Sequence, residues 1–175
     1  MKHKVALLSN INMNFVLRML KKEYEVYNTE GYGNELGLLL DRNSSYHAFQ
    51  PDITFFIMDL LEVLEHDWTL ENSSSAITRW FGLFEAGMDA ACEYYISDGY
   101  LWGVEMEALF QPGLRQSLEE QWNTALKGLC EKHKNVHVFP YHSIISKLGE
   151  ENSFSLKMWY MGKILHTNEA QKRIS

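Results

Sequence analysis

The 175-residue sequence predicts a three-layer α/β/α sandwich built around a five-stranded parallel sheet. Short apolar runs alternate with stretches of helical periodicity five times along the chain, which is the pattern of parallel strands joined by right-handed crossovers. The run at residues 53–58 is apolar on both faces, as expected of a central strand. At this length we expect the strand order 2-1-3-4-5 and a single domain over residues 1–175.

The local patterns place the individual elements. Strands are expected at residues 5–8, 24–27, 53–58, 93–97 and 136–139. Helices are expected at residues 15–22, 34–40, 76–91, 114–133, 141–148 and 168–174. The third helix is expected to start after the polar string from Asn72 to Ser75, because Asn and Ser are preferred N-caps. Residues 41–50 are predicted as a loop, residues 59–68 as a loop or short helix, and residues 100–113 as an irregular aromatic segment. On this plan, the almost fully buried residues include Leu7, Phe55, Ile57, Trp80, Phe84 and Leu126.

Composition and charge exclude several functional classes. The net charge of −7 argues against nucleic acid as a partner, since nucleic-acid binding needs a basic face. No apolar run reaches the roughly 20 residues of a membrane helix, and the run after Lys4 is too short for a signal peptide. We therefore expect a cytoplasmic protein that binds no membrane. Cys92 and Cys130 form no CxxC pair and the His residues have no metal-ligand spacing, so we expect no disulfide, no metal and no cofactor.

The first strand-to-helix turn is the most informative site for function. Ligands and nucleophiles of open α/β sheets gather at this turn, and here it contains Ser9, Asn10 and Asn12. It has no glycine-rich loop of the kind that holds phosphates. The turn therefore favours hydrolase-like chemistry, or a site that has lost its chemistry, over nucleotide binding.

Several short strings in a fixed order carry a family resemblance. They are Val5-Ala-Leu-Leu-Ser-Asn10, Pro51-Asp-Ile-Thr-Phe-Phe-Ile57, Trp122-Asn123, Val136-His-Val-Phe139 with Gly149 downstream, and Trp159-Tyr-Met-Gly-Lys163. Together they resemble the N-terminal domain of FkbH-like proteins, a divergent relative of the SGNH (GDSL-like) hydrolases. The resemblance spans nearly the whole chain. It implies a flavodoxin-like sheet, ester or thioester hydrolysis, and a place in carrier-protein-dependent biosynthesis. We expect the second, glyceryl-loading domain of FkbH-like proteins to be absent.

The chain departs from the SGNH pattern at each catalytic motif. Gly-Asp-Ser falls on Ser9-Asn10-Ile11, so an apolar residue takes the place of the nucleophile. Gly-x-Asn-Asp falls near Asp59-Leu-Leu-Glu62, which lacks the oxyanion Asn. Asp-x-x-His falls on Lys163-Ile-Leu-His166, so the His is kept without its Asp. The middle Gly of the pattern corresponds to Gly31 or Gly33.

The candidate site residues follow from this comparison. Ser9 is the candidate nucleophile and His166 the candidate base, because catalysis by a hydroxyl needs a base within hydrogen-bond reach. The candidate binding residues are Asn10, Asn12, Asn34, Asp59 and Asp98. Each candidate also has a structural explanation, since Ser, Asn and Asp commonly end strands and cap helices.

Two functions remain open from the sequence. The first is a divergent SGNH-hydrolase-like domain with a degenerate or rearranged site for a small-molecule or carrier-bound acyl substrate, and with negligible esterase turnover. The alternative is a non-catalytic binding module for an acyl carrier protein or a partner enzyme. The net charge of −7 does not favour docking of an acidic carrier protein unless cations cluster locally.

Overall fold

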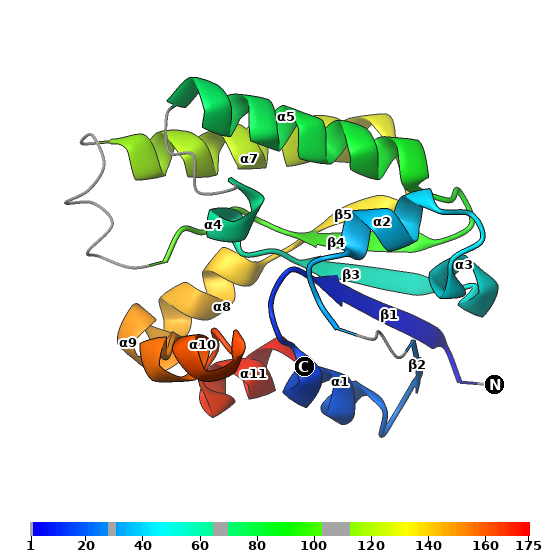
Figure 1. The fold of residues 1–175 in the computed structure, drawn as a ribbon, viewed down its shortest axis with the longest axis horizontal. Coiled ribbons are helices and arrows are strands. Elements are labelled where there is room, and N and C mark those ends of the chain that lie inside the picture. The colour runs from blue at the N-terminus through cyan, green and yellow to red at the C-terminus, as the bar shows by residue number, and fades with distance from the viewer. Residues whose placement is uncertain (1, 28–30, 65–69, 103–112) are drawn as a thin grey trace.

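The computed structural model describes residues 2–27, 31–64, 70–102 and 113–175, and its centre is one parallel sheet (Figure 1). The strands are β1 (Lys4–Ser9), β2 (Glu25–Val26), β3 (Ile53–Ile57), β4 (Glu93–Ser97) and β5 (Val136–Phe139). All four neighbouring pairs are parallel, and the order is β2-β1-β3-β4-β5. The predicted architecture and strand order are confirmed.

Helices cover both faces of the sheet (Figure 1). One layer contains α1 (Asn14–Leu20), α8 (Tyr141–Leu148), α9 (Glu150–Ser153), α10 (Leu156–Gly162) and α11 (Asn168–Ile174). The opposite layer contains α2 (Glu35–Leu40), α5 (Leu70–Gly87) and α7 (Leu114–Lys132). The short α3 (Ser45–Phe49) and α4 (Leu60–Val63) precede and follow β3 in the chain. Within the described ranges, no helix has the length and apolar character needed to cross a membrane.

An aromatic cluster forms the core between β3, β4 and the helices α5 and α7. The ring of Phe56 contacts Trp80 and Phe84 edge-on, with centroids 5.9 Å and 5.2 Å away. Trp80 stacks on Phe84 and packs against Trp122. Such ring pairs stabilise a core beyond the area that they bury. The cluster joins the third strand to two helices that are distant in sequence.

The predicted core is correct except at Phe55. Leu7, Ile57, Trp80, Phe84 and Leu126 are buried as expected. Phe55 is only partly buried, while its neighbour Phe56 is fully buried. Phe55 lies opposite Leu7 and Tyr95 in the sheet register and so faces the layer of short helices. There it stacks on Tyr95, which is itself half-exposed.

The largest differences from the predicted helices are the bounds of α5, which runs from Leu70 to Gly87 and not over residues 76–91, and the presence of α3. Helix α5 begins at Leu70, so the string from Asn72 to Ser75 lies inside the helix and does not cap it. Ser73 is instead buried, and the Ser74 hydroxyl donates to Gln121 of α7 at 2.6 Å. Residues 41–50 contain α3, for which Ser44 accepts a capping bond from the His47 amide. The polar sequence of this segment did not indicate a helix, because Tyr46 is the residue of α3 that is buried.

The C-terminal elements mostly agree with the prediction. Helices α8 and α11 have the expected bounds, and Gly149 follows α8 at a φ of 81°. Residues 155–164, for which no element was predicted, contain α10, with Ser155 as its N-cap. Most of the predicted aromatic segment at residues 100–113 lies outside the described residues.

Candidate binding site at the carboxyl edge of the sheet

Ser9 ends β1 and ties it to β3. Its hydroxyl donates to the Ile57 carbonyl at 2.5 Å and accepts from the Ile11 amide at 3.3 Å. The residue is buried, and Ile11, at the position of the SGNH nucleophile, is buried as well. The hydroxyl proton is therefore already used in holding the two central strands together.

Asn10 and Asp59 join the turns that follow β1 and β3. The Asn10 amide donates to the Asp59 carbonyl, and the Asp59 amide donates to the Asn10 side-chain oxygen, both at 2.8 Å. The Asp59 carboxyl caps α4 through the Leu61 amide and accepts from the Trp102 indole at 3.3 Å. Burial raises the pKa of Asp59 to about 7, against the opposing effect of these two donors. Two of the predicted binding residues are thus in direct contact.

His166 is buried among aromatic rings. Its Nε2 is hydrogen-bonded to the Tyr141 hydroxyl at 2.6 Å, and the Phe154 ring lies beside it. Burial lowers the pKa of His166 to about 3. Ser9 and His166 therefore make their hydrogen bonds to different partners, and the predicted nucleophile–base pair is not hydrogen-bonded in this structure.

The other predicted site residues have connecting or capping positions. The Asn12 side chain donates to the Gly162 carbonyl, and its main-chain amide donates to the Lys163 carbonyl. Asn34 is the exposed N-cap residue of α2. Asp98 accepts from the His142 amide at the start of α8, at 2.6 Å. Asn12 and Asp98 thus connect loops at the carboxyl edge, whereas the Asn34 side chain makes no capping bond.

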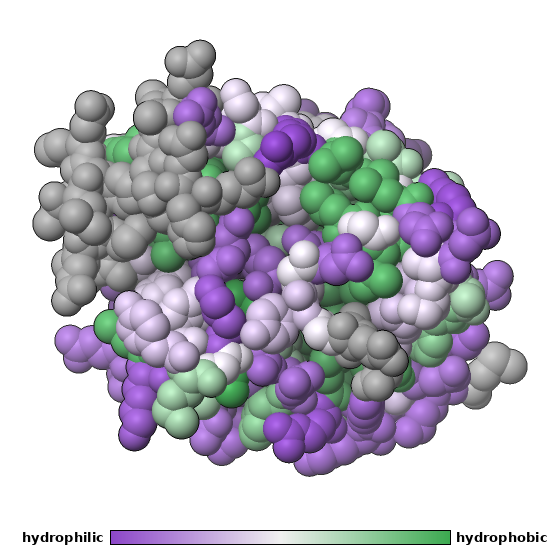
Figure 2. Space-filling model, in the orientation of Figure 1, coloured by the Kyte–Doolittle hydropathy of each residue, from purple (hydrophilic) through white to green (hydrophobic). Residues whose placement is uncertain are grey.

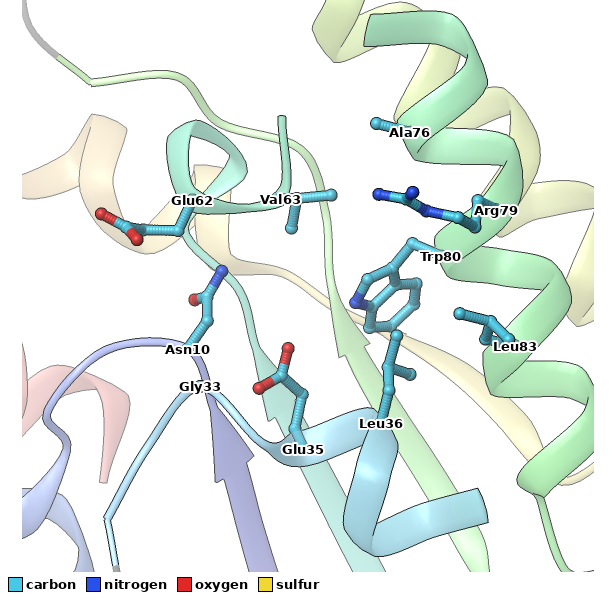
Figure 3. Close-up of a pocket in the computed structure, with 10 residues that line it drawn as sticks. All are labelled: Asn10, Gly33, Glu35, Leu36, Glu62, Val63, Ala76, Arg79, Trp80 and Leu83. Carbon is cyan, nitrogen blue, oxygen red and sulfur yellow. The ribbon is translucent and has the colours of Figure 1, made fainter. Parts of the chain in front are cut away.

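A cavity of about 470 Å³ opens beside the turn after β1 (Figure 3). Its lining comes from that turn and from α2, α4 and α5, and consists of Asn10, Gly33, Glu35, Leu36, Glu62, Val63, Ala76, Arg79, Trp80 and Leu83. Figure 2 shows an apolar patch on this face of the molecule, and the exposed large apolar side chains described on α2 and α5 include Leu40 and Leu83. The volume is typical of a small-molecule site.

Only one predicted site residue, Asn10, lines this cavity. Glu35, Arg79 and Trp80 were missed, because the cavity forms where α2 and α5 approach each other. Each of these residues has an ordinary place in a helical pattern. The one sequence feature that could have indicated this cavity is Glu35, because it directly follows the predicted binding residue Asn34.

The cavity lining includes the charged residues Glu35, Glu62 and Arg79. Glu62 forms an ion pair with Lys163 at 2.8 Å. Burial raises the pKa of Glu35, while its own backbone amide and the Trp80 indole oppose the rise. The Arg79 guanidinium extends toward Val63 across the cavity (Figure 3). In the described part of the chain, no three His, Cys, Asp or Glu residues are grouped to hold a metal ion.

Comparison with known proteins supports the fold. No family model and no curated protein matches this chain. Among solved structures it is similar to the N-terminal part of the protein BF1531 from Bacteroides fragilis, described as containing a phosphatase domain complexed with Mg. The TM-score is 0.79 at 17% identity, over 97% of this chain and 48% of that one. This chain therefore spans about half the length of its structural neighbour, and at this identity the likeness shows the fold alone.

Proposed function

We propose that the chain is a divergent SGNH-hydrolase-like domain, related to the FkbH type, that binds an acyl ligand without hydrolysing it. The ligand is a small-molecule or carrier-bound acyl group, and its site is the cavity between Asn10, α2, α4 and α5. An acyl carrier protein or a partner enzyme would present the group.

The state of Ser9 and His166 carries this proposal. A hydroxyl nucleophile needs a base within hydrogen-bond reach and donors for the oxyanion. Both side chains are buried, and each is hydrogen-bonded to another group, Ile57 and Tyr141 respectively. A His whose pKa is lowered to about 3 is a poor general base near neutral pH. The nearby cavity is open while the catalytic set is not assembled, which favours binding over turnover.

The catalytic half of the proposal is tested with p-nitrophenyl acetate and S-butyryl-N-acetylcysteamine. We expect hydrolysis at the rate of buffer alone. Robust turnover that disappears in both Ser9→Ala and His166→Ala would restore the predicted catalytic pair. Turnover that survives both substitutions would reveal a different catalytic site.

The binding half is tested by calorimetry with S-butyryl-N-acetylcysteamine. Ala76→Trp places a large side chain in the cavity lining, and we expect it to abolish binding. Ala86→Trp is the matched control, because Ala86 is an exposed residue of the same helix outside the cavity lining. Unchanged binding in Ala76→Trp would place the ligand elsewhere.

A further inference from the structure

Helix α10 turns an apolar surface toward the solvent. It buries none of its seven residues. Leu156, Tyr160 and Met161 are 51%, 84% and 78% exposed, the highest values among the large apolar side chains that the structure describes as exposed. A surface helix of a folded protein ordinarily turns its apolar residues toward the core. Exposed apolar side chains that lie together mark interaction sites, so the outside of α10 is a candidate interface.

Four exposed residues form one continuous surface on this helix, and we call it the α10 face. At 3.6 residues per turn they follow one another within about 140° around the helix axis, in the order Leu156, Tyr160, Lys157 and Met161. The lysine therefore lies between two of the apolar side chains. No residue of α10 lines the cavity beside the turn after β1.

Both ends of α10 are attached to the rest of the fold. At the start of the helix, the Ser155 hydroxyl accepts from the Met158 amide at 3.3 Å. At its end, the Gly162 carbonyl accepts from the Asn12 side chain at 3.2 Å. A surface that is already ordered loses little conformational entropy when a partner binds to it.

Lys157 determines which partner suits the α10 face. It is the one charged residue of the helix, and it forms no ion pair with any residue that the structure describes. A partner that covers Tyr160 and Met161 would also remove water from the ammonium group, which is costly unless a carboxylate pairs with it. A two-fold contact between two copies of this face would bring two such lysines into one interface. The α10 face therefore suits an apolar surface that carries a carboxylate, and not a copy of itself.

We propose that the α10 face docks an acidic amphipathic helix of a partner protein. A helix has no open backbone edge to which a strand could add, so the contact is made by side chains, as in the packing of one helix against another. The apolar side of the partner helix covers Leu156, Tyr160 and Met161, and a carboxylate at its margin pairs with Lys157. The inference goes beyond the proposed function and does not depend on it, because the α10 face is no part of the cavity.

The test measures the binding of two labelled amphipathic helical peptides to the whole chain by fluorescence anisotropy. Both peptides carry Leu along one face, and they differ in having Glu or Lys along the margins of that face. We expect the Glu peptide to bind about tenfold more tightly or better, because a like-charge contact at an interface is unfavourable. Lys157→Glu should reverse the preference, so that the Lys peptide binds more tightly.

Matched variants separate docking from general effects of charge and folding. Lys127→Glu makes the same change of net charge at an exposed position of α7 and should keep the preference for the Glu peptide. Tyr160→Ser and Met161→Ser should each weaken binding of that peptide about tenfold, the size of effect found at central interface residues. Val138→Thr alters an exposed apolar residue of β5 and should leave binding unchanged. Because Tyr160 is largely exposed, Tyr160→Ser should keep the urea-unfolding midpoint of the unaltered chain.

Each contrary outcome overturns a different part of the proposal. Failure of both peptides to bind would refute docking of a helix, and equal affinities would refute an acidic partner. An unchanged preference in Lys157→Glu would place the peptide elsewhere on the molecule. If the unaltered chain sediments as a dimer and Met161→Ser as a monomer, a second copy covers the α10 face instead. None of these results affects the acyl-binding test with Ala76→Trp, so the proposed function stands or falls separately.

Discussion

Asp59 and His166 are buried residues whose pKa values are shifted in opposite senses. The pKa of Asp59 rises from 3.8 to about 7, so the native state keeps a proton that the unfolded chain has lost between these values. Stability from Asp59 therefore falls as the pH rises through this range. The pKa of His166 falls from 6.5 to about 3, so the unfolded chain binds a proton that the native state does not. Stability from His166 therefore increases as the pH rises through that range, and the two contributions oppose each other.

Removal of the Asp59 carboxyl should expose the contribution of His166. We expect the free energy of unfolding of Asp59→Asn to rise more steeply between pH 3.8 and 6.5 than that of the unaltered chain. Asn retains an oxygen that can accept from the Leu61 amide. The measurement is urea unfolding at a series of pH values, with Glu120→Gln as an exposed control. An unchanged pH slope in Asp59→Asn would mean that Asp59 is ionised in the native protein at low pH.

At the scale of elements, α5 and α2 approach closely at Gly87. A Cβ atom at this position would lie 2.9 Å from Cγ of Leu39 and 3.0 Å from the Leu39 carbonyl group. Contacts this short with the backbone require α2 to move. Helix α2 begins at Glu35, so the contact at Gly87 helps to set the position of the cavity wall.

Gly87→Ala should destabilise the protein by about 1–3 kcal/mol, the usual cost of overpacking, although Ala is the better helix former. Gly82→Ala is the matched control on the same helix, because nothing lies within 4 Å of a Cβ there. We expect Gly82→Ala to stabilise the protein by up to about 1 kcal/mol. Both values are measured by urea unfolding. A stabilising Gly87→Ala would show that the two helices have room to separate.

The start of α11 depends on Thr167. Its hydroxyl accepts from the Ala170 amide at 3.2 Å and donates to the Asn152 carbonyl at 2.6 Å. Thr167→Ala should therefore cost about 1–2 kcal/mol in the free energy of unfolding, as for other N-cap losses. Thr78→Ala removes an exposed hydroxyl inside α5 and should change stability by less than about 0.5 kcal/mol. Equal costs of the two substitutions in urea unfolding would contradict a capping role.

At the scale of the whole molecule, the two layers on the sheet bury it unequally. Phe56 is fully buried in the aromatic cluster under α5, whereas Phe55 is half-buried on the opposite face. Phe56→Ala should cost about 3–5 kcal/mol, the usual cost for a buried aromatic side chain. Phe55→Ala should cost clearly less. Equal costs in urea unfolding would contradict unequal burial of the two faces.

The strands were predictable from sequence because their apolar runs are continuous, as at residues 53–57. Which of Phe55 and Phe56 is more deeply buried was not predictable, because a continuous apolar run does not indicate which face of the sheet is better covered. In the same way, Asn10 and Asp59 were found from their places at strand ends, and they do meet. Glu35 and Trp80 were not found, because only the packing of α2 on α5 places them at one cavity. The local sequence pattern thus predicts helices and strands, whereas the cavity depends on contacts between helices that are distant in sequence.

The bonds from Asn12 to the Gly162 and Lys163 carbonyls have a consequence for biosynthesis. One of them joins residues separated by 150 positions. A ribosome releases the chain from its N-terminus onward, so the turn after β1 emerges long before its partners exist. The turn after β1 therefore lacks both bonds until residues 162 and 163 have been made, and a stalled chain that ends before residue 160 would leave this part of the turn without its partners.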